Sequence, residues 1–385
     1  MTSGTCLRTS FSLGAAFIGS VPIGAMRVIL LIYLVSASVS PSQATILLAL
    51  YSIANAIGLS VQGRLMGTMG HTPVLVVTSF VHAAVLIMLP NAGSFAVLAV
   101  MCAVAGCSFP ELNTSMRALL LQIPDEKRSR SLWSMSAGLF EVSAVGGPLL
   151  GSWVVPSLGG QLAFVLLATW MLAATCIYVC CIRGTSHGAR PKRSSASGRG
   201  LREFPLFLMY GSQGAAFAAL AVTAGLVGVS SNSPFLVGLA RSTLSVGSLL
   251  GAAWLAVRSR LSTWRAIVIA FMALTAASSV TILVDRIPVL VGLLLVAGCA
   301  LTPITVMTGT LVRKEHAATS MAILQASSML AGSAATACAG WLFESHGAGS
   351  AFGVAAGAGA FGLCVAGIAA CRAAPRWESL VPTKR

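Results

Sequence analysis

Charged side chains are scarce in this chain. Only 9% of its 385 residues are charged, and Asp and Glu together number nine. A soluble globular domain carries roughly 25% charged residues, so a protein of that class is excluded. Hydrophobic residues make up 56% of the sequence, and this composition predicts a membrane protein.

Sequence signatures of catalysis are missing as well. The sequence contains no glycine-rich phosphate loop and no nucleophile elbow. Its ten cysteines have no spacing that suits a metal site or a disulfide framework. We therefore expect no enzyme, no bound metal and no cofactor. The energy for any transport must then come from an ion gradient or from the gradient of the substrate itself.

Stretches of about 20 apolar residues recur along the whole chain, and each can cross a hydrocarbon core of roughly 30 Å as a helix. The first stretch is too long for a cleaved secretory signal and is followed at once by another, so we expect it to be retained. The twelve expected spans are 11–35, 43–62, 74–90, 94–115, 132–155, 161–182, 204–229, 234–256, 264–284, 288–311, 319–342 and 348–371.

Basic residues give the chain a formal net charge of +15, and they fall on alternate connections between the expected spans. One side of the membrane has only Arg286, next to Asp285. This asymmetry follows the positive-inside rule, so we expect both termini in the cytoplasm and no nucleic-acid partner. The basic residues expected on the cytoplasmic side are Arg8, Arg64, Arg117, Lys127, Arg128, Arg130, the cluster from Arg183 to Arg202, Arg258, Arg260, Arg265, Arg313, Lys314, Arg372, Arg376, Lys384 and Arg385.

The chain also divides into two similar halves. A segment rich in Gly, Ser and Arg separates six expected spans from six others, and it has no apolar periodicity, which predicts a flexible linker. The halves repeat each other at an offset of about 190 residues. "AGCSFP" at 105–110 returns as "AGCALTP" at 297–303, and Trp153, Gly159, Ala163 and Phe164 return as Trp341, Gly347, Ala351 and Phe352.

We accordingly expect an all-α membrane protein of twelve transmembrane helices in two six-helix bundles with pseudo-two-fold symmetry. The expected parts are an N-terminal bundle (1–182), a basic cytoplasmic linker (183–203), a C-terminal bundle (204–371) and a cytoplasmic tail (372–385). Such a six-plus-six repeat is typical of a transporter whose halves rock about a central site.

The connection after the second span carries a motif, "GRLMGTMGHTPVLV" at 63–76. It resembles the signature loop of the major facilitator superfamily as found in drug exporters, except that Gly67 stands where that family has an aspartate. The resemblance implies the major facilitator fold, and it implies that this aspartate helps to hold the outward-facing arrangement in related proteins. The matching positions are Gly63, Arg64, Leu65, Gly70, His71, Pro73, Val74 and Leu75.

The fifth span has a second motif, formed by Gly138, Gly147, Pro148 and Gly151. These residues resemble the Gly-Pro "antiporter" motif of proton-coupled drug exporters. Small residues let helices approach closely, and a proline frees a backbone carbonyl and bends the helix. The segment is therefore interpreted as a helix pivot, with ordinary small-residue packing as the alternative. Across the whole chain the likeness is greatest to actinobacterial-type permeases, which have "LPxG" in the first span (here Val21-Pro22-Ile23-Gly24) and a Glu before the Gly-Pro of the fifth span.

Charged residues inside spans are costly and are treated as functional hypotheses. Glu141 in the fifth span lies near mid-membrane, and Arg27 in the first span and Arg241 in the eighth lie at comparable depth. In the resembling family the fifth and eighth spans meet, so Glu141 has two candidate partners. Three roles stay open for this group: proton coupling or gating, a fixed ion pair, or direct contact with substrate.

Several uncharged or peripheral polar residues are candidates for lining a substrate cavity, with helix-to-helix hydrogen bonding as the alternative. His82, by contrast, is expected to be a satisfied interior or interfacial histidine. Arg27 in a cavity favours an anionic or polar neutral substrate. The candidates besides Arg27 are Asn113, Gln213, Gln325, Glu111 and Asn55.

Three functions remain open at this point. The first is proton-coupled export of a small organic compound such as a drug or antibiotic, by a monomer in the cell membrane. The second is uptake or exchange of a polar metabolite such as a sugar or an organic anion. The third is a transport-dead membrane scaffold or sensor, which is suggested by the missing aspartate at Gly67. The expected partners are a small-molecule substrate, protons and the lipid bilayer.

Overall fold

The computed structural model describes residues 3–120, 126–182, 204–257, 263–284, 286–312 and 317–378. Some predictions lie outside these residues: the linker 183–203, Arg258, Arg260, Asp285, Arg313, Lys314, Lys384 and Arg385, and the side chains of Arg8, Arg117, Lys127, Arg128, Arg130 and Arg376.

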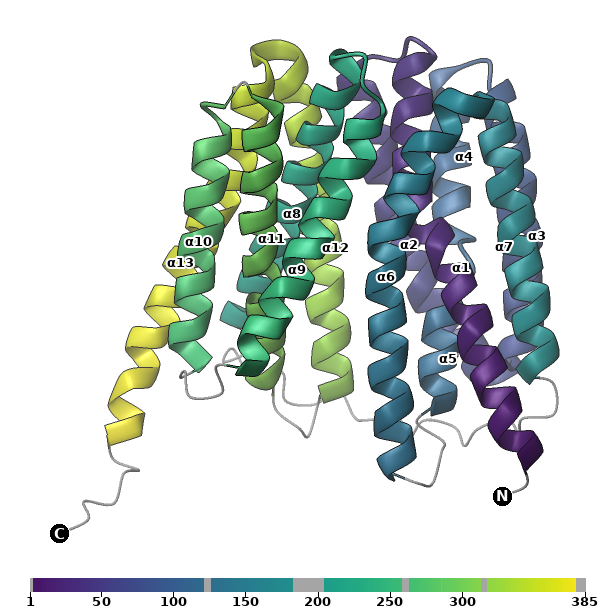
Figure 1. Ribbon diagram of the computed structural model, residues 1–385, viewed down its shortest axis with the longest axis horizontal. Helices are drawn as coiled ribbons and strands as arrows, with labels where there is room; N and C mark the ends of the chain where they lie inside the picture. Colours follow the sequence, from purple (N-terminus) through teal and green to yellow (C-terminus); the bar gives the residue numbers. More distant parts are fainter. Residues whose placement is uncertain are drawn as a thin grey trace. The chain divides into compact units, whose positions relative to one another are not determined.

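The described residues form helices joined by short connections (Figure 1). The helices before the linker segment are α1 (Ser3–Ser36), α2 (Pro41–Met69), α3 (His71–Met88) with a 3-10 turn (Leu89–Asn91), α4 (Phe95–Cys107), α5 (Leu112–Leu120), α6 (Glu126–Leu158) and α7 (Gly160–Ile182). Those after it are α8 (Phe204–Ser230), α9 (Phe235–Val257), α10 (Thr263–Thr281), α11 (Ile287–Thr310), α12 (Ala317–His346) and α13 (Ala348–Glu378).

This arrangement confirms the prediction of an all-α protein with many membrane spans. Within the described ranges, 11 helical segments are long and apolar enough to cross a membrane. The predicted span 319–342 lies within the helix α12.

The predicted span 94–115 agrees with a candidate membrane span at Phe95–Met116. It is not one continuous helix, however, because α4 ends at Cys107 and α5 begins only at Leu112. Pro110 lies in the gap; it has no backbone N–H to donate and disfavours helical geometry in the residue before it. At the other end of the chain, α13 continues to Glu378, beyond Cys371, where the last span was predicted to end.

The chain forms two compact units. The first comprises Met1–Arg193 together with Gly225–Ser242, and the second comprises Ser194–Ala224 together with Thr243–Arg385. The adjoining ends of α8 and α9 thus belong to the first unit. The bundle limits 1–182 and 204–371 stay a prediction.

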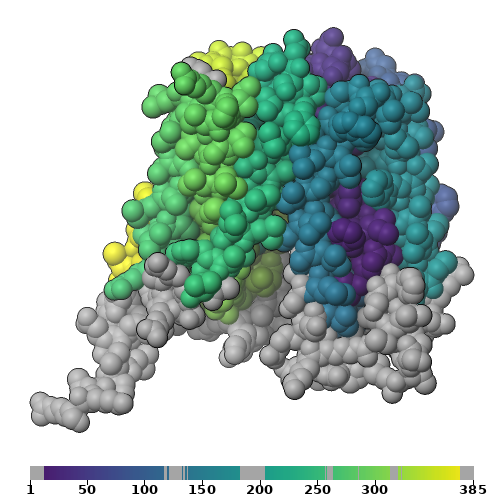
Figure 2. Space-filling model, in the orientation of Figure 1, coloured from purple at the N-terminus to yellow at the C-terminus, as the bar shows by residue number. Residues whose placement is uncertain are grey.

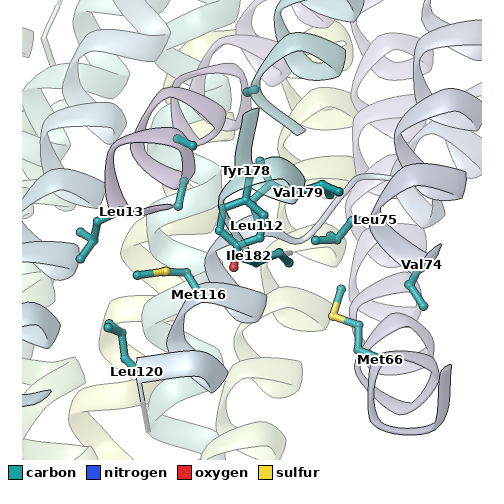
Figure 3. Packing of buried hydrophobic residues seen from close by; sticks show 13 residues of the cluster. Leu13, Met66, Val74, Leu75, Leu112, Met116, Leu120, Tyr178, Val179 and Ile182 are labelled. Atoms are coloured by element: carbon teal, nitrogen blue, oxygen red, sulfur yellow. The ribbon is translucent and has the colours of Figure 1, made fainter. Parts of the chain in front are cut away.

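In the first unit, α1 packs against both α6 and α7, α2 packs against α4, and α3 packs against α7. The space-filling view shows α1 in purple between α6 and α7 (Figure 2). A group of buried side chains from α1, α2, α3, α5 and α7, here called the Tyr178 cluster, packs together in this unit (Figure 3). It consists of Leu13, Ala15, Ala16, Met66, Val74, Leu75, Leu112, Met116, Leu120, Ala174, Tyr178, Val179 and Ile182.

In the second unit, α10 packs against α11 and α13, and α12 packs against α13. The helix α9 also crosses α11 closely in this unit, since a methyl group on Gly298 would overlap the carbonyl oxygen of Leu244. Ser248 and Thr302 join the same two helices, because the Thr302 hydroxyl donates to the Ser248 carbonyl at 2.7 Å.

The predicted internal repeat is visible as a repeated helix crossing. In the first unit, methyl groups on Gly58 and Gly106 would overlap backbone atoms of Cys107 and Tyr51. In the second unit, Gly251 faces Cys299 in the same way as Gly58 faces Cys107, and Gly298 faces Leu244 as Gly106 faces Tyr51. In each half, the glycine of the "AGC" segment therefore lies where two helix backbones are in contact.

Candidate functional site

The signature motif forms a tighter connection than the predicted loop. α2 continues to Met69, α3 starts at His71, and only Gly70 lies between them. Gly70 has φ 88° and its N–H donates to the Met66 carbonyl at 3.1 Å, as in a glycine that ends a helix. Only glycine adopts this φ without strain, and this explains why the motif has glycine at this position.

The other motif positions lie on helix surfaces. Gly63 and Arg64 are exposed on the last turns of α2, and Pro73 is exposed in the first turn of α3. Gly67, which replaces the family's aspartate, is also exposed, and a Cβ atom there would meet no atom of the described residues within 4 Å. The position therefore has room for a Cβ atom.

His71 takes part in a chain of hydrogen bonds. His71 Nδ1 and Ser115 Oγ share a hydrogen bond of 2.8 Å, and the Tyr178 hydroxyl donates to Ser115 Oγ at 2.9 Å. Tyr178 is fully buried within the cluster named after it (Figure 3). The chain of bonds fastens the start of α3 to α5 and α7. The sequence indicated His71 only, because a lone Ser and a lone Tyr in apolar helices have no distinguishing spacing.

Three of the four predicted pivot residues form the contact between α6 and α1. A methyl group on Gly147 would lie 2.5 Å from the Val21 carbonyl oxygen, and one on Gly151 would lie 2.9 Å from that of Ala25. On the α1 side, Gly24 faces Pro148 in the same way at 2.8 Å. These positions have no room for a side chain, so the two backbones touch. Gly138 differs, since no atom of the described residues lies within 4 Å of its Cβ position.

The first part of α9 contacts the same segment of α6. A methyl group on Gly238 would overlap the Pro148 carbonyl oxygen and the hydroxyl of Ser152. One turn later, the Ser242 hydroxyl donates to the Val145 carbonyl at 2.6 Å. Pro148 therefore lies at a place where α6 is in close contact with both α1 and α9.

The structure brings two of the three predicted charged residues together. Arg27 and Arg241 are both half-buried, and their guanidinium groups are close enough for their charges to interact. Tyr51 lies near Arg27 and also near Glu111. The sequence did not indicate Tyr51 as a member of this group.

Glu141 does not join them in this conformation. It is half-buried on α6, and within the described residues no charged group acts on its carboxyl group. Neither of its two predicted ion pairs, with Arg27 or with Arg241, is thus formed here. The reason is position along the helix, because Glu141 precedes Pro148 by two turns and the arginines lie beside Pro148.

The predicted cavity residues have different environments. Asn113 donates to Ser20 Oγ at 2.8 Å, which is a hydrogen bond between α5 and α1. Glu111 accepts a hydrogen bond from Thr114 Oγ1 at 3.2 Å. In the second unit, Gln213 is half-buried and its Oε1 has no hydrogen-bond partner among the described residues. Gln325 is exposed on α12.

The gap between α4 and α5 is stabilised by side chains from α2 and α3. Gln62 Nε2 donates to the carbonyls of Cys107 at 3.0 Å and Phe109 at 2.8 Å. His82 is buried and its Nδ1 lies 2.9 Å from the Ala105 carbonyl oxygen, which confirms the prediction of a satisfied interior histidine. Asn55 makes a longer contact of 3.4 Å with the Gly106 carbonyl.

Comparison with protein-family profiles gives one match, described as Major Facilitator Superfamily, over residues 11–264. The chain belongs to the major facilitator superfamily. A search of curated proteins found no match for this superfamily member.

Solved structures have the same fold as this major facilitator chain. A crystal structure of the peptide transporter POT, with a glutamate-to-glutamine substitution, has a TM-score of 0.75 and 16% identity, covering 96% of this chain and 94% of that chain. A crystal structure of the nucleoside transporter NupG, with an aspartate-to-alanine substitution, has a TM-score of 0.70 and 12% identity, covering 94% of this chain and 99% of that chain.

Such low identities establish the fold alone. Together, the superfamily and the fold of these structures indicate a multi-pass membrane transporter for a small molecule rather than an enzyme. The described contacts therefore have to be interpreted as parts of a transport mechanism.

Proposed function

We propose that this protein is a secondary active transporter that works by alternating access and exports a small organic compound, such as a drug or antibiotic, in exchange for protons. The observation that carries the proposal is the contact of Gly147, Pro148 and Gly151 with α1. A backbone contact without interlocking side chains lets two helices shift against each other at little cost. This contact supports the interpretation of α6 as a pivot.

Glu141 is the proposed proton-binding group. It lies on the same helix as the pivot, is half-buried and has no charged neighbour within the described residues. A carboxyl group in a membrane span is rarely retained without function. Movement at the pivot changes the surroundings of Glu141. The changed surroundings shift the pKa of its carboxyl group, and the group then binds or releases a proton. Arg27 and Arg241 are proposed to gate this step by approaching Glu141 in another conformation of the cycle.

The direction of transport is proposed from two motifs. The segments 63–76 and 138–151 both resemble those of proton-coupled drug exporters. The basic connections support a cell-membrane protein with both termini in the cytoplasm. We propose that it acts as a monomer, because each chain has both halves of the repeat.

A second candidate is uptake or exchange of a polar metabolite, in particular an organic anion. The observation that favours it is the proximity of the Arg27 and Arg241 charges. The two candidates share one mechanism and differ in direction and substrate.

The test uses an expression host that lacks its own exporters. Cells that produce the protein are screened against a panel of antibiotics and organic acids, and transport of each compound that gives resistance is measured in inverted vesicles with and without a proton gradient. We expect gradient-driven accumulation in the vesicles, abolished in Glu141→Gln and retained in Glu344→Gln, whose carboxyl group is exposed on α12.

Three outcomes would contradict the proposal. Increased uptake of a panel compound into intact cells favours the polar-metabolite candidate. Normal proton dependence in Glu141→Gln rules out this residue as the coupling group. No transport of any compound, in either direction, by a correctly folded protein supports the scaffold or sensor hypothesis.

A further inference from the structure

Pro22 lies inside the transmembrane helix α1, in the segment Val21-Pro22-Ile23-Gly24. A proline has no backbone N–H, and its ring clashes with the carbonyl of the residue four positions earlier. Here that carbonyl belongs to Ile18, which therefore has no partner within its own helix. Prolines at such positions bend helices, so α1 has a place where its direction can change.

Trp170 on α7 supplies the missing donor. Its indole Nε1 donates to the Ile18 carbonyl at 3.0 Å. Both residues lie at the surface of this unit, where each is 41% exposed. The hydrocarbon core of a membrane contains no water that could pair with a free carbonyl. The bond from Trp170 thus takes the place of the one that Pro22 removes.

The depth of Trp170 is unusual for a tryptophan in a membrane protein. Tryptophans are enriched at the two membrane interfaces, where the indole N–H meets water. Trp170, in contrast, lies near the middle of its span, Gly160–Ile182. At that depth its N–H also needs a partner within the protein. The free carbonyl of α1 and the N–H of Trp170 satisfy each other, and we interpret the pair as a specific contact between the two helices.

The two parts of α1 on either side of Pro22 contact different helices. Before the proline, Leu13 belongs to the Tyr178 cluster together with side chains from α5 and α7. After the proline, Gly24 lies against Gly147 and Pro148 of α6. The first part of α1 is thus fastened to α5 and α7, and the second part is fastened to α6. Figure 2 shows α1 between α6 and α7.

We propose that α1 bends at Pro22 during the transport cycle and that Trp170 is a positioning residue that holds this bend. The inference rests on the proposed transport function and names the hinge that moves Arg27, because Arg27 lies on the part of α1 after Pro22. While the bond to Ile18 is formed, the direction of this part is fixed relative to α7. When the bond is released, the part can turn with α6 and change the distance between Arg27 and Glu141. A single hydrogen bond adds only modest net stability, so it can be released in each cycle.

A double-mutant cycle tests the bond without transport. The full-length protein is purified in detergent, and the melting temperatures of its variants are compared. Trp170→Phe leaves the Ile18 carbonyl unpaired and is expected to lower the melting temperature by about 2–5 °C. Pro22→Ala restores a backbone N–H that pairs with this carbonyl. In that background Trp170→Phe is expected to lower the melting temperature by less than about half as much.

Pro156→Ala is the matched control, since Pro156 is another proline inside a helix, α6, and is exposed. In this background Trp170→Phe is expected to lower the melting temperature as much as it does in the wild type. The loss of indole packing is the same in every background. Only the hydrogen bond therefore predicts a difference between the Pro22→Ala and Pro156→Ala backgrounds.

Two further measurements test the hinge itself. Hydrogen exchange, followed by mass spectrometry on peptides of α1 that include Pro22, is expected to be faster in Trp170→Phe and slower in Pro22→Ala. In inverted vesicles, Pro22→Ala is expected to lower kcat by about ten-fold or more for the compound that the screen identifies, and to change KM little, because motion rather than binding is impaired.

The inference is overturned if Trp170→Phe lowers the melting temperature equally in the Pro22→Ala and Pro156→Ala backgrounds, or not at all. It is also overturned if Pro22→Ala transports at the wild-type rate, since α1 then works without a hinge at this position. The two proposals fail separately. A wild-type protein that transports no compound refutes the proposed function, while the melting temperatures and the hydrogen exchange still decide whether Trp170 holds the bend.

Discussion

At the scale of the residue, single glycines decide how closely helices approach. Gly146 and Gly147 are neighbours in sequence, but they face different surroundings. Gly147 faces the backbone of α1, whereas no atom in the part of the chain that the structure describes lies within 4 Å of the Cβ position of Gly146. Two glycines that look identical in the motif therefore differ in what a side chain would disturb, and this difference provides a controlled experiment.

Replacing Gly147 by alanine is expected to destabilise the protein by about 1–3 kcal/mol, since the added methyl group forces α1 and α6 apart. Gly146→Ala, one residue away, is expected to change stability little or to increase it slightly. Both variants are compared with the wild type by thermal unfolding in detergent. An equal loss of stability in both would show that helix propensity, and not the contact with α1, determines the effect.

At the scale of the element, the break between α4 and α5 is the main departure from a simple span. A helix end leaves its last carbonyl groups without N–H partners, and Pro110 removes one more donor. Gln62 on α2 and His82 on α3 supply donors or hydrogen-bonding nitrogen atoms to these carbonyls. The break is therefore stabilised by specific side chains of the first unit. It places Glu111 and Asn113 at the start of α5.

Replacing Gln62 by leucine tests whether the break between α4 and α5 depends on the Gln62 amide. In Gln62→Leu the carbonyls of Cys107 and Phe109 lose their donor in a buried place, and we expect a loss of roughly 1–3 kcal/mol of stability. Gln43→Leu, at an exposed position near the start of the same helix, serves as the control and is expected to be neutral. Thermal unfolding of both variants tests this, and unchanged stability in Gln62→Leu would mean that water or another group replaces the amide.

At the scale of the whole molecule, the protein is a chain of helices with two units that each repeat the same glycine-mediated crossing. Such crossings stabilise membrane proteins through van der Waals contact, because burial from water drives little association within lipid. The asymmetric distribution of basic residues predicts how the chain is oriented across the membrane. It predicts that the C-terminus lies in the cytoplasm.

Reporter fusions test this orientation. A fluorescent protein at the C-terminus is expected to be bright, and alkaline phosphatase at the same place is expected to be inactive, since its disulfides form only outside the cytoplasm. Phosphatase inserted after Ser38, between α1 and α2, is expected to be active. The opposite pattern at the two sites would mean that the chain is inserted upside down.

Much of this protein could be predicted from its sequence because the lipid bilayer imposes simple rules. Long apolar runs in lipid must be helical, and basic connections must stay on one side. The spans, the repeat, the family resemblance and the interior His82 all depend on such local features. The break at Pro110 was missed because apolar composition masks a gap of four residues, and Gln62 was missed because its partners are backbone carbonyls on another helix.

The sequence by itself determined which charges lie in the membrane, since Arg27, Glu141 and Arg241 are each surrounded by apolar residues. Only the tertiary structure decided which of them meet. The glycine contacts of α6 set the height and rotation of α1 and α9, and these bring Arg27 beside Arg241 while Glu141 lies two turns away. Partners of charges depend on helix rotation and offset, and both are fixed by packing between segments that are far apart in the chain.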